Sequence, residues 1–502
     1  MCVSRLTVAA AVTALVAGTP ALADVTPQQV WDELQGYLES FGYEVTARET
    51  TDGDRLVVTP LSIAMPMPED NGSGVFEIGE MILEPTGDGS VSVRLPETMP
   101  IMVKVDPKDE ESIDMALDYH ARDFALTVSG DPGDLTYDFA ATSLGIELVR
   151  LIVDGETIPP EGARFDASTG PVDGDARVVH RDGGRDITQT VSLGDLTYDL
   201  MFDDPESRSA GTLSGTLTGL HSATEADVPD APATGDAAMR LSNTSEFGAG
   251  SSRFSFSEDG KTATGETSSE GGRIAVKLSG DDLAYDVAAD GVNWAMTSGD
   301  LPFPVSASMD EMRFNLAMPT GVSETPEDAA LGVTLGGLTL SDGVWSIFDP
   351  KGVMPRDPAT VVLDLTAKVT PLVDFTNPEA MAGFEMLGKE PAELNALTLR
   401  NLTVEAVGAS LTGEGAFTFD NSDKTTFDGV PRPEGQLDLS LTGANALMDR
   451  LIELGAIEER EAMGARMMLG MFAVPGDEPD SLTSTLEVND KGQVLANGQR
   501  IR

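Results

Sequence analysis

Hydrophobic residues in this chain recur mostly at every second position, in short runs separated by glycine, proline, asparagine and aspartate. Such alternation predicts β-strands with one apolar and one polar face, and the separating residues favour turns. Arg55–Met65, Ala125–Phe139 and Thr360–Val369 are clear examples. We therefore predict a mainly β protein of the α+β class, built on a large antiparallel sheet that is twisted or partly rolled.

Helical spacing of apolar residues occurs near the two ends of the chain. Thr26–Gln29 has the residues of a helix N-terminus, and Gly42 is suited to end the helix that follows. Ala444–Gly455 and Glu458–Phe472 predict a helical hairpin near residues 444–472, packed on an apolar surface through a methionine-rich face. The first helix is expected to bury Val30, Leu34, Tyr37, Leu38 and Phe41. The hairpin contains Met448 in its first helix and Met463, Met467, Met468 and Met471 in its second.

Three segments share a short pattern, GDLTYD at 133 and 194 and DDLAYD at 281, and each contains a tyrosine. On a strand, Tyr137, Tyr198 and Tyr285 point to the apolar face and the neighbouring aspartates point to the other face. Aspartates four residues apart in one strand are about 13 Å apart, beyond the roughly 5–9.5 Å of glycosidase carboxylate pairs. We interpret the pattern as a repeated structural unit, the second strand of a hairpin. The predicted hairpins span residues 125–139, 190–200 and 273–287.

Residues 1–23 have the order of a cleavable secretory signal. Arg5 is the only charged side chain, and the apolar run over residues 6–18 is too short to cross a bilayer. We expect cleavage after Ala23 and a periplasmic location. Cys2 is the only cysteine and lies in the part to be removed, so we expect no disulfide and no thiolate chemistry in the mature chain.

The mature chain is predicted to contain two β-rich regions. The first covers residues 24–222, and the second covers residues 237–502 and includes the helical hairpin. Residues 223–236 are rich in proline, aspartate, alanine and threonine with little periodicity, which is typical of a linker or a long surface loop. No later segment is apolar enough to be a transmembrane helix.

The chain carries 84 acidic and 32 basic residues, a formal net charge of −52. The carboxylates are spread along the whole sequence, which is typical of a solvated acidic surface. Such a charge repels nucleic acid and anionic lipid surfaces, and no cluster of lysine and arginine offsets it. We therefore expect no nucleic-acid partner, and we interpret the acidity as suited to salty solvent, which screens self-repulsion within roughly 8 Å.

Candidate chemistry is sparse. His120, His180 and His221 lack the spacing of metal ligands, and no nucleophile elbow, phosphate loop or dinucleotide fingerprint is present. Thr51–Asp54 and Asp173–Asp175 resemble fragments of calcium loops, but neither completes one, and ordinary hairpin turns explain them. We assign no catalytic, cofactor-binding or metal-binding residue, and we expect no cofactor.

The segment from Ser341 to Val369 is more distinctive. Asp342 is expected to cap a short helix through Trp345, and the prolines that follow predict a rigid turn before a strand. We interpret the segment as a packed corner with Trp345 buried and Arg356 paired with Asp349 or Asp357.

The same region carries a family resemblance. Trp345, Asp349-Pro350 and Pro355–Ala359, with Gly492–Val494 and Asn497–Gln499 near the end, resemble an uncharacterised domain-of-unknown-function family of exported alphaproteobacterial proteins of about 500 residues. The resemblance implies a signal peptide, a β-rich body, a late helical hairpin and a periplasmic home. It implies no catalytic residue.

Two classes of function follow from these observations. The first is a non-enzymatic periplasmic envelope protein that binds a lipid, another hydrophobic ligand or a partner protein on an apolar sheet face. The alternative is a carboxylate-dependent hydrolase acting on glycan or polyester, which requires two acidic side chains within about 9.5 Å in one cleft.

Overall fold

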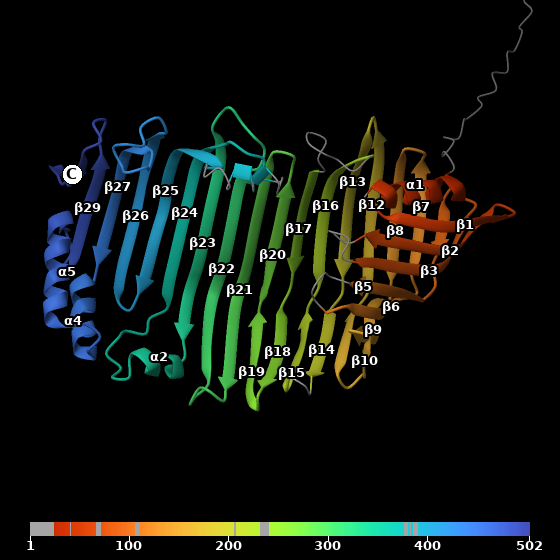
Figure 1. The fold of residues 1–502 in the computed structure, drawn as a ribbon, viewed down its shortest axis with the longest axis horizontal. Helices are drawn as coiled ribbons and strands as arrows, with labels where there is room; N and C mark the ends of the chain where they lie inside the picture. Colours follow the sequence, from red (N-terminus) through yellow and green to blue (C-terminus); the bar gives the residue numbers. More distant parts are fainter. Residues whose placement is uncertain are drawn as a thin grey trace, which may run out of the picture.

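The computed structural model shows one antiparallel sheet of 31 strands in the part of the chain that it describes, with helices at both ends (Figure 1). The described residues are 25–502, except 41, 67–71, 106–110, 205–206, 231–239, 376–379, 382 and 385–389. The predicted mainly β class with a large antiparallel sheet and terminal helices is confirmed. The expected signal segment, residues 1–23, lies outside the described residues.

Helical segments and strands have the following bounds. Helices span α1 (Pro27–Ser40), α2 (Asp342–Phe348), α4 (Ala444–Leu454) and α5 (Glu459–Phe472). The first strands are β1 (Glu44–Asp52), β2 (Arg55–Pro66), β3 (Gly72–Pro85), β4 (Val91–Arg94), β5 (Thr98–Val105), β6 (Ile113–Arg122), β7 (Ala125–Asp131), β8 (Asp134–Ala141), β9 (Ser143–Val153) and β10 (Glu156–Ile158). The middle strands are β11 (Ala163–Thr169), β12 (Val172–Arg181), β13 (Gly184–Leu193), β14 (Leu196–Asp204), β15 (Ser209–Leu217), β16 (Leu220–Pro229), β17 (Arg240–Phe247), β18 (Gly250–Glu258), β19 (Lys261–Ser269), β20 (Gly271–Leu278) and β21 (Asp282–Ser298). The last strands are β22 (Val305–Pro319), β23 (Glu327–Leu340), β24 (Ala359–Pro371), β25 (Ala392–Ala406), β26 (Ala409–Asp420), β27 (Arg432–Thr442), β28 (Val474–Pro475), β29 (Ser481–Val488), β30 (Val494–Ala496) and β31 (Gln499–Arg500).

The sheet is an up-and-down meander of long strands, many of them interrupted near the middle. β11 and β12 follow one another with two residues between them, and they pair with β14 and β13, respectively. β15 and β16 pair with β18 and β17 in the same way. The half-strands on each side of the interruption pair only with one another and so form two separate hydrogen-bonded series. Long strands join the two series at both ends, because β3 pairs with both β4 and β5, and β21 pairs with both β19 and β20. A crease thus runs across the sheet, perpendicular to its strands.

The hydrophobic alternation shifts by one residue at the crease. In the strand formed by β13 and β14, Leu193 and Leu196 flank the crease, and both belong to the apolar series of their own half. A Cβ atom at Gly194 would lie 3.0 Å from the Cα atom of Gly170 on the neighbouring strand, so side chains do not fit between the two backbones here. Glycine at this line therefore permits the close backbone approach that the crease requires.

The shift keeps apolar side chains on one side of the sheet. Tyr119 and Ala121 of β6 lie before the crease, and Leu126 and Val128 of β7 lie after it in the same long strand. All four contribute to one hydrophobic core. The alternation of side chains thus shifts by one residue at the crease, as it does at a β-bulge, and the apolar side chains of both halves stay on the same side of the sheet.

The N-terminal helix closes this core. Thr26 Oγ1 accepts a hydrogen bond from the backbone N of Gln29 (3.3 Å), and the Gln29 side chain accepts one from the backbone N of Thr26 (2.9 Å), which is the expected capping box. Trp31, absent from the predicted face, is fully buried, and its indole N donates a hydrogen bond to Glu49 (2.9 Å). The wide sheet curls around the helix, so more than one helix face is covered.

Two of the three predicted hairpins are confirmed. β7 pairs with β8, and β20 pairs with β21. The third, over residues 190–200, is wrong, because β13 and β14 are two halves of one long strand and pair with different neighbours. Gly194-Asp195 has the composition of a turn but marks the crease instead.

The segment expected as a linker, residues 223–236, differs from that expectation. Its first residues belong to β16, which pairs with β13 and β17, so the sheet is continuous at this point. Residues 231–239 lie outside the described residues. The strand was not recognised from the sequence because β16 alternates small and polar residues and has few large apolar ones. The division into two β-rich regions stays a prediction.

The C-terminal helical hairpin is confirmed, and Met448 of α4 is buried as expected, but the orientation expected for the methionines of α5 is wrong. Ala462 of α5 is buried with Ala444 and Met448 of α4, and Leu469 packs against this cluster. The methionine side chains face solvent with exposed fractions of 57–71%: Met463, Met467, Met468 and Met471. Among the described residues, no helix combines the length and the apolar character needed to cross a membrane.

Candidate ligand-binding face

One side of the sheet carries apolar side chains in rows that cross many strands, and we call this side the apolar face. In one half, strand register aligns Phe165, Leu200, Leu213 and Phe254 on β11, β14, β15 and β18. In the other half, a row runs from β20 to β25 and consists of Ile274, Val287, Phe314, Val333, Leu363 and Leu402. Directly paired residues point to the same side of a sheet, so each row is continuous across its strands.

Helices cover this face at its two ends. At the N-terminal end, Glu33 of α1 contacts His180 (2.5 Å) and Arg185 (3.1 Å), two residues in line with the apolar series of β12 and β13. At the other end, Met448 of α4 packs with Leu441, which belongs to the apolar series of β27. Figure 1 shows α1 and the α4–α5 pair at opposite ends of the long sheet.

Between these ends the apolar face is open. Six large side chains on it have exposed fractions of 36–46%: Leu200, Phe202, Phe256, Ile274, Tyr285 and Phe314. A second layer of structure would bury such residues almost completely. A contiguous open apolar surface of this kind is typical of a site that binds a ligand or a partner.

Aromatic rings on the face lie across glycines of neighbouring strands. A Cβ atom at Gly174 would lie 2.6 Å from the Phe139 ring, and one at Gly272 would lie 2.6 Å from the Phe247 ring. The same relation holds for Tyr198 and Gly215, Phe254 and Gly265, and Phe202 and Gly211. Each ring therefore occupies the space that a side chain at the glycine would fill, and the surface of the face is nearly flat at these positions.

The three tyrosine-bearing segments are β-strands, as predicted, and their aspartates form ion pairs between strands. Asp134 accepts two hydrogen bonds from Arg177 (2.7 and 2.6 Å), and Asp199 accepts two from Arg164 (2.8 and 2.5 Å). Hydrogen bonding by Arg177 lowers the pKa of Asp134 below its usual value. On the apolar side, burial raises the pKa of Tyr137, and the nearby Glu33 carboxylate raises it further. These contacts give the repeat a structural role.

A polar cluster interrupts the apolar face on β16 and β17. The Asn243 side-chain amide donates hydrogen bonds to Ser222 Oγ (2.9 Å) and Thr224 Oγ1 (2.9 Å). Ser245 Oγ lies 3.0 Å from both Ser222 Oγ and Asn243 Oδ1. Sequence reasoning missed this cluster, because its members meet only through the register of the strands.

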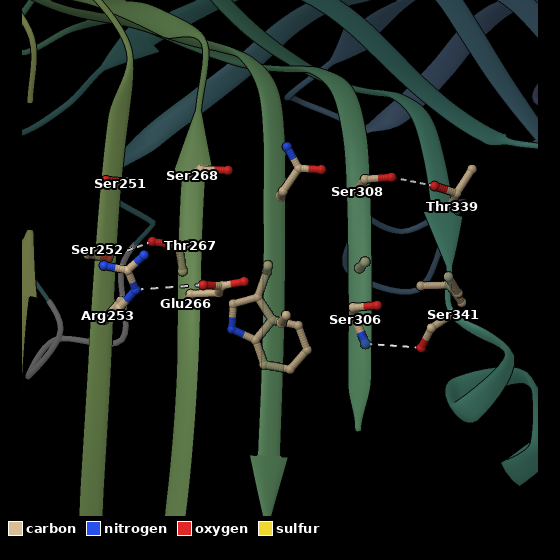
Figure 2. A pocket seen from close by; sticks show the side chains of 15 residues that line it. Ser251, Ser252, Arg253, Glu266, Thr267, Ser268, Ser306, Ser308, Thr339 and Ser341 are labelled. Atoms are coloured by element: carbon tan, nitrogen blue, oxygen red, sulfur yellow. Dashed lines mark hydrogen bonds and ion pairs between the residues drawn. The ribbon is translucent and has the colours of Figure 1, made fainter. Parts of the chain in front are cut away.

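A depression lined mainly by hydroxyl groups has a volume of about 580 Å³ and lies on β18, β19 and β21–β23. Figure 2 shows its side chains pairing across strands, with Ser252 near Thr267 (2.6 Å) and Arg253 near Glu266 (3.8 Å). The labelled polar groups thus largely form hydrogen bonds or ion pairs with one another. The depression resembles a sheet surface more than a reaction cleft.

Acidic side chains also meet across strands. Glu147 and Asp166 are directly paired on β9 and β11, beside a depression of about 340 Å³, and both side chains are exposed. The three histidines lie apart, each with its own partner: His120 with Glu147, His180 with Glu33, and His221 with Ser192. In the described part of the chain, no group of three or more histidine, cysteine, aspartate or glutamate side chains is placed to hold a metal ion.

The second half of the chain matches a known protein family. Residues 244–501 match the family described as an uncharacterized protein conserved in bacteria, DUF2125. The chain belongs to the DUF2125 family. No curated protein and no solved structure matches it. The DUF2125 match begins in β17 and includes most of the open apolar face and the helical hairpin. The resemblance inferred from Trp345 and Pro355–Ala359 is thereby confirmed as to family.

The corner that carries this resemblance is packed as predicted, but two of its contacts differ. Ser341, not Asp342, occupies the N-cap of α2, and Arg356 pairs with Asp342, not with Asp349 or Asp357. The Arg356 guanidinium also lies 5.6 Å from the centre of the buried Trp345 ring. Arg356 therefore pairs with the first residue of α2.

Asp349, at the C-terminal end of α2, is instead buried. Its carboxylate accepts hydrogen bonds from the backbone N of Val353 and Met354, both 3.0 Å. Burial alone would raise the pKa of Asp349, but these hydrogen bonds outweigh it and the pKa is lowered. The residue therefore acts as an anchor for the turn rather than as a proton donor.

Proposed function

We propose that this protein binds a lipid or another hydrophobic ligand on its open apolar face, as a non-enzymatic protein of the periplasm. The observation that carries the proposal is the run of half-exposed apolar side chains between two helix-covered ends. Each methylene group removed from water contributes about 0.8 kcal/mol. A long acyl chain therefore gains enough on this face to offset its immobilisation, whereas a small polar molecule does not.

The alternative, a carboxylate-dependent hydrolase, has one observation in its favour, the facing pair Glu147 and Asp166. Such enzymes place one carboxyl group in an apolar pocket, which keeps it protonated as the general acid. Here both side chains are exposed, and Glu147 lies 3.4 Å from His120. Neither carboxyl group lies in an apolar pocket, so we prefer ligand binding.

Two adjacent residues of β18 provide a matched test. Phe256 lies on the apolar face and Ser255 points to the opposite face, so Phe256→Glu and Ser255→Glu add the same charge to different sides of one strand. With purified residues 24–502, we expect the neutral dye Nile red to bind wild type and S255E alike. We expect F256E to weaken binding about 10-fold, because a carboxylate must be desolvated under the ligand.

Mass spectrometry of an organic extract of the purified protein adds an independent readout. We expect co-purifying acyl lipids with wild type and S255E and less lipid with F256E. Equal Nile red binding by the two variants, together with an extract free of lipid, would remove the proposal.

A further inference from the structure

The polar cluster of Ser222, Thr224, Asn243 and Ser245 lies within an otherwise apolar surface. Direct strand pairing places Val276 beside Asn243 and Ile274 beside Ser245 on the same side of the sheet. A neighbouring depression of about 320 Å³ is lined in part by Ile187, Ala226, Leu241 and Leu278. A ligand that crosses the open face in this region thus meets hydroxyl and amide groups with apolar surface on both sides.

The hydrogen bonds of the cluster leave one donor over. The Asn243 amide donates to Ser222 Oγ and to Thr224 Oγ1, so each of these hydroxyl oxygens accepts within the cluster. Ser245 has one hydroxyl hydrogen, and when it donates this hydrogen to Asn243 Oδ1, Ser222 can donate its own to Ser245 Oγ. Among the hydrogen bonds of the described residues, Thr224 then remains the one hydroxyl of the cluster that donates to no protein acceptor.

We propose that this cluster binds the uncharged ester carbonyl of an acyl lipid, whose chain lies along the adjacent apolar rows. The proposal rests on the function proposed above and names the ligand class for the same face. The neutral O–H donor of Thr224 matches a lone pair of a carbonyl oxygen. The four side chains carry no positive charge, and the chain as a whole has a net charge of −52, so a free carboxylate is disfavoured.

The test compares three ligands with similar chains: methyl myristate, hexadecane and myristate, each used to displace Nile red from residues 24–502. One hydrogen bond to the ester predicts that methyl myristate binds about 5-fold more tightly than hexadecane. We expect myristate to bind more weakly than the ester. Equal binding of ester and hydrocarbon, or tighter binding of myristate, would overturn the ester proposal while the proposed function stands. Failure of all three ligands to bind would contradict the proposed function itself.

A triple variant isolates the cluster. Ser222→Ala, Thr224→Val and Asn243→Leu together remove its donors and make the patch apolar, and we expect the ester-to-hydrocarbon ratio to fall to about one while hexadecane binding is kept. Ser242→Ala with Thr244→Val on the opposite face of β17 is the control, and it should keep the wild-type ratio. If the triple variant keeps the wild-type ratio of ester to hydrocarbon binding, the assignment of the cluster is overturned. If the variant does not fold, the ratio measured with wild type alone decides whether the ester is preferred.

Discussion

At the scale of single residues, Asp480 shows how a distant side chain completes a helix. Its carboxylate accepts hydrogen bonds from the backbone N of Asn445 (3.1 Å) and Ala446 (3.0 Å) in the first turn of α4. The N-cap position itself is Gly443, whose residue type offers no capping side chain. Partial burial would raise the pKa of Asp480, but the hydrogen bonds outweigh this effect and lower it.

Replacing Asp480 with alanine should therefore weaken α4. We expect a loss of about 1 kcal/mol in the local stability of the helix, seen as faster hydrogen exchange of the α4 amides. Because the folded-state pKa is depressed, the contribution is complete above the unfolded pKa of about 3.9 and is lost as pH falls through the folded value. Residue 480 has a φ of 55°, where alanine is strained, so a small part of the cost of D480A does not depend on pH. The difference between wild type and D480A should thus become smaller at low pH, whereas a difference that does not change with pH, or an equal effect of Asp477→Ala, would contradict the assignment.

At the scale of elements, α1 is held on the sheet by a nearly buried ion pair. The side chains of Glu33 and Arg185 have exposed fractions of 11% and 6%, and Arg185 also lies 5.9 Å from the centre of the Tyr37 ring. Among the described residues, removal of Glu33 leaves the buried Arg185 with only the exposed Asp230, 3.7 Å away, as acidic partner, which is costlier than the loss of an exposed pair.

Glu33→Gln is expected to destabilise the N-terminal end by about 3 kcal/mol, measured by urea unfolding with a probe near α1. The exposed neighbour Asp32 provides the control, and Asp32→Asn should cost less than about 0.5 kcal/mol. Similar effects of the two variants would show that the pair does not hold the helix.

At the scale of the whole molecule, a single-layer sheet carries a net charge of −52 with a hydrophobic core concentrated at the N-terminal end. Most ion pairs lie on exposed surfaces, where each contributes little. Long-range repulsion between carboxylates therefore weighs heavily in the stability of this fold, and dissolved ions screen it.

Raising NaCl from 10 mM to 500 mM should increase the melting temperature by roughly 5 °C. LiCl at the same ionic strength should have a similar effect if screening is the cause, and sucrose at the same osmolality should have a smaller one. A melting temperature that falls or stays constant with salt would mean that the favourable ion pairs dominate.

Local sequence was enough to predict some features and not others. The capping box at Thr26 and the strands around Tyr137 and Tyr285 depend on residues close in sequence, and they are found as expected. The crease at Gly194 could not be distinguished from a turn, because both need glycine and differ only in which strand lies alongside. The cluster around Asn243 depends on strand register, which composition does not encode.

The open apolar face is the central claim, and photo-crosslinking tests it most directly. Residues 24–502 would be irradiated with a fatty-acyl ester that carries a diazirine in its chain, and the labelled residues would be mapped by mass spectrometry. We predict labels at Phe202, Phe256, Ile274 and Phe314 and few on the opposite face, such as at Ser255 and Arg273. Labels spread over both faces, or confined to the exposed methionines of α5, would contradict the account.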